Sequence, residues 1–440
     1  MKDGELDTEY GINGYATVPP QHIIPGRSLR TTAAVLMPDD SVVAYGTNPE
    51  DPEQFFFTRI NADGSPDLTK GHVKVKRTAD ASPLDTYHVQ NIYRAAESSF
   101  ITFAPCVTYS VEYEGQDAKF TTVAIGRYGV DFAPWPGFGD NGIVKMTHAM
   151  DGMTGTSSLT QSPFPTLTHQ PGPPQKQVSK YGDSSQLING LIRAVYSTEV
   201  LLRLGSEKLW LSLLDPDTGA PVPGLGQDGD ACHLELEQYQ GQTMMPRCVR
   251  FLEDGGFYLT ATTGHSHVLA KFLANGLLDP TFASNGVKKL DYVNLVFPMA
   301  IIDNKFWIAS TYLNEVTLLC LDKNGNHDPN FNSGRPLGIP CDVYNMMEPQ
   351  AITLDAQGRV LITGQRGAFL SRSLQPVAYR VLVEGKLDET FGVNGMFTAD
   401  ASLTFLKATF FATDYTLLLN IQKFNLGDDT EGSVLIRITS

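Results

Sequence analysis

Short apolar runs alternate with turn-forming residues along the whole chain, and no long window carries helical periodicity. Residues 31–37 form one apolar run of strand length, and residues 303–309 and 358–364 form others that begin at a tight turn of Asp-Asn or Gly. The 40 glycines and 27 prolines are dispersed, as expected for many tight turns. The pattern therefore predicts an all-β fold of many short strands.

A repeated motif separates groups of these strands. A polar residue and a glycine are followed, at steps of three residues, by Asp, an aromatic residue and an Asn-Gly pair. Clear copies occupy residues 3–14, 275–286 and 384–395, and weaker copies are led by Gly64, Gly129, Gly219 and Gly325.

The residue types of the motif suit a structural task. Glycine supplies positive φ in tight turns, and the Asp side chain accepts backbone N–H groups. We expect the aromatic residue to pack between neighbouring sheets, where its burial contributes about 1.5–3 kcal/mol. An Arg or Lys precedes five of the seven copies and is expected to pair with the motif Asp: Arg59, Arg127, Lys271, Arg380 and Arg437.

The spacing of the motif predicts a closed ring. The lead glycines recur about every 60 residues, and the step from Gly385 through Ser440 to Gly4 keeps that spacing. Four strand signals in each repeat predict a seven-bladed β-propeller with four-stranded antiparallel blades, a single domain over residues 1–440. Residues 436–438 continue into the motif at residues 3–4, so the N- and C-terminal strands are expected to complete one shared blade.

The frame resembles the delta-60 repeat, a bacterial unit of about sixty residues regarded as a β-propeller of unassigned function. Residues 385–392, Gly-Lys-Leu-Asp-Glu-Thr-Phe-Gly, match its consensus best. The resemblance covers nearly the whole chain except residues 147–186. It implies the fold, and it implies no catalytic residues.

The amino-acid composition disfavours several classes of binding partner. The formal net charge of −15 and pI of about 5.0 disfavour nucleic acid and anionic membrane surfaces. Five cysteines with no CxxC pair predict free thiols, not a disulfide framework or zinc site. No signal-like or membrane-spanning apolar run occurs, so we expect a soluble monomer, cytoplasmic or exported without an N-terminal signal.

Two segments suggest metal chemistry, each with a structural alternative. Residues 322–328 place Asp and Asn around Gly325 as in a short calcium loop, but the turn-capping role is favoured. His265 and His267 share one face of an extended segment without a recognisable third ligand. We therefore expect no cofactor and no metal, with calcium kept as an alternative.

Residues 147–186 break the repeat period between the second and third blades. Long connections of this kind are commonly functional, and the nearby segment 131–137 is also aromatic and proline-rich. The predicted interaction surface consists of Trp135, Phe138, Met150, Met153 and Phe164.

The sequence favours a non-enzymatic scaffold that binds a protein or a glycan through loops on one propeller face. It contains no Gly-x-Ser-x-Gly, Walker-type or His-Glu-x-x-His motif. A hydrolase or lyase with its site at the central channel is the first alternative. A component of a bacterial toxin or a surface or exported system is the second.

Overall fold

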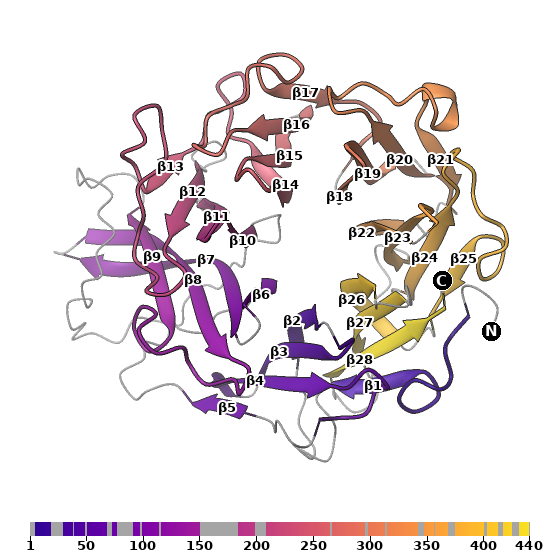
Figure 1. Cartoon of the computed structure of the whole chain (residues 1–440), viewed down its shortest axis with the longest axis horizontal. Helices are drawn as coiled ribbons and strands as arrows, with labels where there is room; N and C mark the ends of the chain where they lie inside the picture. Colours follow the sequence, from indigo (N-terminus) through magenta and orange to yellow (C-terminus); the bar gives the residue numbers. More distant parts are fainter. Residues whose placement is uncertain are drawn as a thin grey trace. The chain divides into compact units, whose positions relative to one another are not determined.

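Seven four-stranded antiparallel sheets contain the strands of the described residues in the computed structural model (Figure 1). The chain divides into two compact units, residues 1–76 with 288–440 and residues 77–287. The structure describes residues 5–18, 30–37, 39–48, 51–67, 73–76, 91–96, 99–113, 116–149, 184–198, 208–264, 266–294, 298–312, 315–341, 347–355, 357–367, 375–399, 403–411, 417–424 and 431–439.

The first unit holds four sheets. In three of them neighbouring strands follow one another in the sequence, and in the fourth the first strand of the chain pairs with the last. They are β2(Arg30–Leu36), β3(Val42–Asn48), β4(Asp51–Ile60) and β5(Val73–Lys76); β18(Met299–Ile302), β19(Lys305–Tyr312), β20(Glu315–Leu321) and β21(Leu337–Pro340); β22(Met347–Leu354), β23(Val360–Arg366), β24(Gln375–Val381) and β25(Met396–Thr398); and β26(Leu403–Phe411), β27(Leu417–Phe424), β28(Glu431–Ile438) and β1(Tyr15–Val18). A 3₁₀ turn, η2, spans Asn332–Gly334.

The second unit holds two sheets and most of a third, whose last strand crosses the boundary between the units. They are β6(Asn91–Ala96), β7(Ser99–Tyr113), β8(Gln116–Gly129) and β9(Ile143–Ala149); β10(Ser184–Ile188), β11(Leu191–Thr198), β12(Lys208–Leu214) and β13(His233–Glu235); and β14(Met245–Phe251), β15(Phe257–Thr263), β16(Ser266–Phe272) and β17(Val287–Leu290). The four-stranded antiparallel sheets predicted from the repeat are thus confirmed.

One sheet is completed by both ends of the chain, as the sequence predicts. β1 pairs with β28 in antiparallel register, with Tyr15 opposite Ile436. The backbone N–H of Asp7 donates to the carbonyl of Arg437 at 3.0 Å, so the first motif joins the last strand. The terminal strands therefore cover an edge that neither would cover alone.

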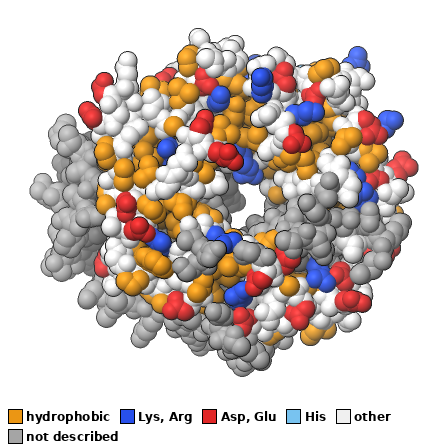
Figure 2. Space-filling view, in the orientation of Figure 1, with side chains coloured by type: hydrophobic (Ala, Val, Ile, Leu, Met, Phe, Trp, Pro, Cys, Tyr) orange, Lys and Arg blue, Asp and Glu red, His pale blue; other side chains and the backbone are white. Residues whose placement is uncertain are grey.

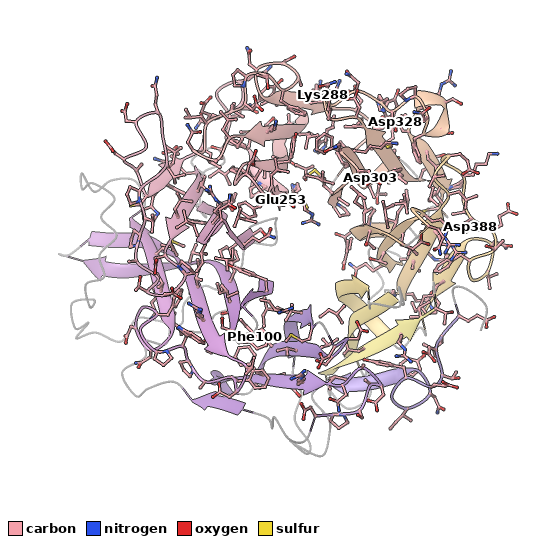
Figure 3. The ribbon with its side chains drawn as sticks, in the orientation of Figure 1. Phe100, Glu253, Lys288, Asp303, Asp328 and Asp388 are labelled. Carbon is pink, nitrogen blue, oxygen red and sulfur yellow. The ribbon has the colours of Figure 1, made fainter. Side chains whose placement is uncertain are left out.

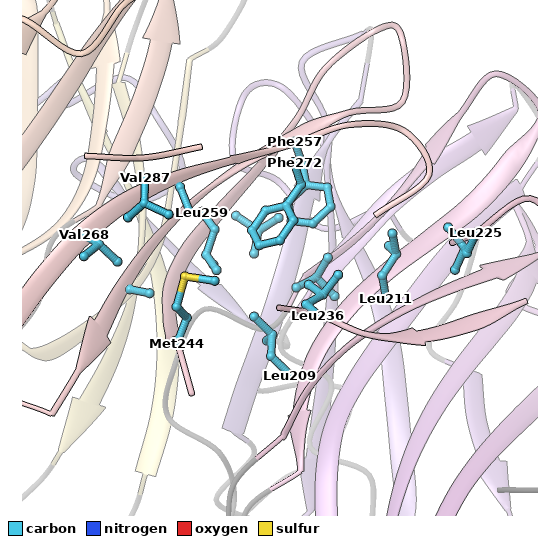
Figure 4. Close-up of a cluster of buried hydrophobic side chains, with 14 of the residues drawn as sticks. Leu209, Leu211, Leu225, Leu236, Met244, Phe257, Leu259, Val268, Phe272 and Val287 are labelled. Atoms are coloured by element: carbon cyan, nitrogen blue, oxygen red, sulfur yellow. The ribbon is translucent and has the colours of Figure 1, made fainter. Parts of the chain in front are cut away.

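Within each unit, the hydrophobic core lies between consecutive sheets. In the second unit, leucines of β12 pack against β15 and β16, where Phe257 and Phe272 stack with ring centroids 4.7 Å apart (Figure 4). A similar cluster joins the sheets β18–β21 and β22–β25 in the first unit. Period-two alternation explains this arrangement, because alternate side chains of one strand face opposite neighbouring sheets.

The irregular segment is shorter than the sequence suggests. Residues 147–149 belong to β9 and residues 184–186 belong to β10, so regular strands enter the predicted insertion from both sides. Residues 150–183 lie outside the described residues. Within the described ranges, no helix has the length and apolar character needed to cross a bilayer.

Candidate functional site

The strands of each sheet end at two edges. The turn between the first and second strands and the motif connection between the third and fourth lie at one edge, here called the motif edge. The turn between the second and third strands and the connection to the next sheet lie at the other, here called the variable edge. Repetition at the motif edge indicates a shared structural task, whereas connections at the variable edge differ from sheet to sheet.

At the motif edge, each oxygen of the motif carboxylate has a separate role. Oδ1 of Asp388, the residue labelled in Figure 3, accepts the backbone N–H of Thr390 at 3.1 Å. Its Oδ2 accepts Nε–H of Arg380 at 2.7 Å. The guanidinium of the fully buried Arg380 also lies 4.9 Å from the ring centroid of Phe391. The predicted cation–Asp pairing is confirmed here and in Arg437–Asp7, Lys271–Asp279 and, at 4.0 Å, Arg59–Asp67.

The motif aromatics form part of the core, as predicted. Their exposed fractions are 3% or less. In each case the backbone N–H donates to the carbonyl of the motif Asp three residues earlier, which closes a short turn. The residues are Tyr10, Phe282, Phe331 and Phe391.

The environment of these carboxylates favours their ionised form. Burial opposes ionisation of Asp388, but hydrogen bonds from Thr390 and the charge of Arg380 outweigh it and lower its pKa. The hydrogen bond from Lys305 is the main cause of the lowered pKa of Asp328. Ionised motif carboxylates therefore stabilise the native state.

Where the motif cation is missing, a neighbouring strand supplies one. Cys320 takes the cation position opposite Asp328, and Nζ of Lys305 on β19 lies 2.6 Å from that carboxylate. Burial, followed by the Asp328 charge, raises the pKa of Cys320 to about 12. Cys320 is thus a buried thiol, as predicted, and a poor nucleophile.

The copy near Gly129 keeps the frame without extra residues, which corrects the alignment made from sequence. Phe132, with φ of 66°, takes the place of the lead glycine, and Trp135 takes the place of the Asp. Phe138 follows three residues later as the motif aromatic, before Asn141-Gly142. The aromatic and proline-rich segment 131–137 is therefore part of a motif turn.

The motif also joins consecutive sheets. The residue after the motif aromatic, or after Leu225 where the copy at Gly219 has no aromatic, donates its N–H to the carbonyl that precedes the next lead glycine, at 2.7–3.0 Å. Because the two backbones meet here, a Cβ at Gly385 would lie 2.7 Å from the backbone nitrogen of Asn332. The bonds run from Gly11 to Asp63, Gly139 to Thr218, Gly226 to Asn275 and Asn332 to Glu384.

The interaction surface predicted from sequence is not assembled by the described residues. Phe138 is fully buried, so its place in that surface is wrong: it is the aromatic of a motif turn. Trp135 is half-buried, with the Arg127 guanidinium 4.2 Å from its ring centroid. Met150, Met153 and Phe164 lie outside the described residues, so that part stays a prediction.

The other sequence candidates act mainly within the fold. Oδ1 of Asp322 accepts the backbone N–H groups of Asn324 and Asn326, which confirms its turn-capping role. His267 is half-buried, with a pKa lowered by burial and then by Arg247, and His265 lies outside the described residues. Among the described residues, no group of three His, Cys, Asp or Glu side chains is placed to hold a metal ion.

One serine–histidine pair has the composition of a nucleophile and its base. Oγ of Ser212 lies 2.6 Å from Nδ1 of His233 and 2.9 Å from the hydroxyl of Tyr196. Ser212 has no exposed surface and lies in the middle of β12, so a substrate does not reach its hydroxyl. The three side chains link adjacent strands of one sheet.

The variable edge of the sheet β18–β21 exposes two aromatic rings. Tyr292, in the connection from β17, is 51% exposed, and Tyr312, at the end of β19, is 37% exposed. Their ring centroids are 5.9 Å apart with an interplanar angle of 77°. They are the only aromatic residues among the large hydrophobic residues found exposed in the described part of the chain.

The backbone holds Tyr292 outward. Its φ of 62° is left-handed, a conformation that costs a non-glycine residue about 1–2 kcal/mol. The neighbouring Val293 is buried, and the N–H of Asn294 donates to Oγ of the buried Ser310 at 2.8 Å. Exposed rings held by a constrained backbone form a preorganised surface, so we take this tyrosine pair as the candidate site.

The sequence reasoning missed both tyrosines because they belong to no repeated frame. The available signal was an aromatic residue in a connection between two repeats, at residues 291–294, Asp-Tyr-Val-Asn. The pairing of Tyr292 with Tyr312 requires the strand register and was not predictable from that signal.

No family model matches this chain, and no curated protein matches it. Among solved structures, it is similar to a prolyl endopeptidase (9% identity, TM-score 0.42, covering 93% of this chain and 50% of that one). It is also similar to prolyl oligopeptidase B from Galerina marginata (10%, 0.44, 94% and 52%) and to a protein from Lactobacillus plantarum (9%, 0.40, 88% and 92%). The chain spans about half the length of the two peptidases.

Proposed function

We propose that this chain is a non-enzymatic binding scaffold, a closed seven-bladed β-propeller that holds a protein or glycan ligand at the variable edges of its blades. The delta-60 resemblance of the motif supports the same architecture. The repeated residues of the motif stabilise the fold. We therefore expect ligand recognition to involve residues that do not repeat.

Three observations support the ring. Consecutive sheets pack through their faces within each unit, the motif bonds run from one sheet to the next, and one sheet contains both ends of the chain. Four-stranded sheets joined to their neighbours in this way, with one sheet completed by both ends of the chain, are typical of a propeller.

The observation that carries the binding role is the exposed pair Tyr292–Tyr312. Tyrosine buries a large area on binding at low cost in side-chain entropy, and it combines an apolar ring with a polar hydroxyl. The backbone strain at Tyr292 indicates that this exposed position is maintained at a cost. Met150, Met153 and Phe164 fall between β9 and β10 in the sequence, outside the described residues, so their part in recognition stays a prediction.

We expect ligand binding to require the tyrosine pair. The full chain is screened on a glycan array and a peptide library, with the double variant Tyr292→Ser/Tyr312→Ser beside it. The matched control is Ile12→Ser/Val393→Ser, which removes two exposed apolar side chains, 80% and 73% exposed, at the motif edge. Every ligand should lose at least about tenfold in affinity with the tyrosine variant and keep its affinity with the control.

Equal binding by the wild type and the tyrosine variant for all ligands found would contradict this proposal. Circular dichroism and thermal unfolding of each variant establish that the fold is kept. Both tyrosines are at least one-third exposed, so their replacement should change stability little.

A further inference from the structure

The strand register places a carboxylate beside the tyrosine pair. Tyr312 and Glu315 are opposite each other in the β19–β20 hairpin, so their side chains leave the same face of the sheet. Both are exposed. A ring and a carboxylate on one face form a surface that attracts cations.

The carboxylate of Glu315 has room to lie on that face because residue 338 on β21 has no side chain. A Cβ at Gly338 would be 2.1 Å from Oε2 of Glu315. Gly338 is extended β-strand backbone and is absent from the positive-φ glycines, so its φ does not require glycine. The Glu315 carboxylate therefore occupies the space that a side chain at residue 338 would fill.

The same chemistry occurs elsewhere in this chain with its cation present. Arg437 pairs with Asp7 and lies 4.9 Å from the centroid of Tyr10, and Arg380 does the same with Asp388 and Phe391. Each forms a triad of ring, carboxylate and guanidinium. Tyr312 and Glu315 place a ring and a carboxylate on one face, with the carboxylate over Gly338 on β21, and none of the described cations pairs with either.

We propose that Tyr292, Tyr312 and Glu315 form a subsite for the cationic side chain of a partner protein, an arginine or lysine that completes this triad from outside. The inference rests on the proposed function and names the chemistry of its ligand. The exposed Asp291 beside Tyr292 adds a second negative charge. The net charge of −15 attracts a basic segment, and the triad gives it a defined position.

The position at which a basic segment binds is expected to depend on particular carboxylates. Figure 2 shows Asp and Glu side chains interspersed with Lys and Arg over the described part of the visible face. A mixed surface gives weak attraction that salt screens, so specific binding needs local groups.

The test measures binding of a fluorescein-labelled Arg-Gly-Arg-Gly-Arg peptide to the full chain by fluorescence anisotropy at about 0.15 M salt. Glu315→Gln and Tyr312→Leu should each weaken binding about tenfold, and Tyr312→Phe should keep it, because the ring remains. The matched control is Glu384→Gln, which removes one exposed carboxylate at the motif edge. It should change affinity less than about twofold.

A second variant acts without touching the three residues. Gly338→Ala meets only the flexible end of Glu315 within 3.0 Å, so it should fold normally and move the carboxylate from its place over β21. Peptide affinity should then differ from that of the wild type, and an unchanged affinity would contradict a role for the carboxylate in that position. Equal effects of Glu315→Gln and Glu384→Gln would show general charge attraction and overturn the subsite. Binding of a neutral oligosaccharide that depends on the tyrosines but not on Glu315 would contradict the claim that the subsite binds a cationic side chain. The proposed binding function would still hold. The proposed function itself would be contradicted only if no ligand lost affinity for the tyrosine double variant, and the subsite would then be contradicted with it.

Discussion

Replacing Asp388 by asparagine is expected to lower the free energy of unfolding by about 3–5 kcal/mol. The substitution keeps the shape of the side chain and removes the charge that faces Arg380, whose side chain has no exposed surface. A buried guanidinium without its counter-charge is costly, which gives the effect its size. Urea unfolding followed by circular dichroism measures the change in midpoint.

An exposed ion pair provides the control. Lys208 and Glu235 are 3.0 Å apart with side chains 40% and 37% exposed, so Glu235→Gln should cost less than about 1 kcal/mol. The double variant Arg380→Met/Asp388→Asn should recover part of the loss, because the unpaired charge is then removed. Equal losses in Asp388→Asn and Glu235→Gln would contradict the structural role of the motif pair.

The cost of Asp388→Asn should also depend on pH. The native pKa of Asp388 is lowered, so its ionised form adds stability above the unfolded pKa of about 4. That stability is lost as the pH falls through the lower native pKa, where the wild-type carboxylate is protonated as well. The difference between wild type and variant should therefore be largest at neutral pH and shrink in acid.

The substitution Gly385→Ala is expected to destabilise the chain by about 2–5 kcal/mol, in two parts. The left-handed φ of 84° costs an alanine about 1–2 kcal/mol. A Cβ 2.7 Å from the nitrogen of Asn332 must displace backbone that donates to Glu384, which adds about 1–3 kcal/mol. Urea midpoints again measure the loss.

Gly226→Ala separates the two parts. Gly226 has nearly the same φ, 83°, but nothing lies within 4 Å of the position that a Cβ would take there, so only the strain applies. The difference between the two alanine variants reports the close approach of neighbouring sheets. If both variants lose the same stability, the lead glycine serves its own turn and does not join the sheets.

The sequence predicts the architecture well because the motif combines several local rules. Glycine with positive φ, the capping Asp, the cation before it and the buried aromatic all follow from residue chemistry, and the structure shows each of them at residues 380–391. The pairing of β1 with β28 was predictable because the break in the chain falls inside a repeat.

The prediction fails where residue type and position in the frame disagree. Gly129 looks like the lead residue, but the structure gives that place to Phe132, so the sequence pattern predicts an exposed Phe138 where the structure has a core residue. Composition alone does not distinguish an aromatic-rich turn from a recognition loop. The number of blades in a closed ring and the delta-60 family stay predictions.

The candidate site could not be predicted from the sequence, for a different reason. Tyr312 becomes a neighbour of Glu315 through the register of one hairpin and of Tyr292 through the path of a connection. Lys305 serves Asp328 in the same way, from the strand beside the one that holds Cys320. Such neighbours are set by three-dimensional packing, which a repeat motif does not encode.

Hydrogen–deuterium exchange of the full chain, with and without a ligand selected in the screen, tests the central claim most directly. The claim predicts added protection in residues 291–294 and 308–317 at the variable edge and no change in the motif turns, such as residues 382–392. Protection confined to the motif turns, with residues 291–294 and 308–317 unchanged, would contradict it.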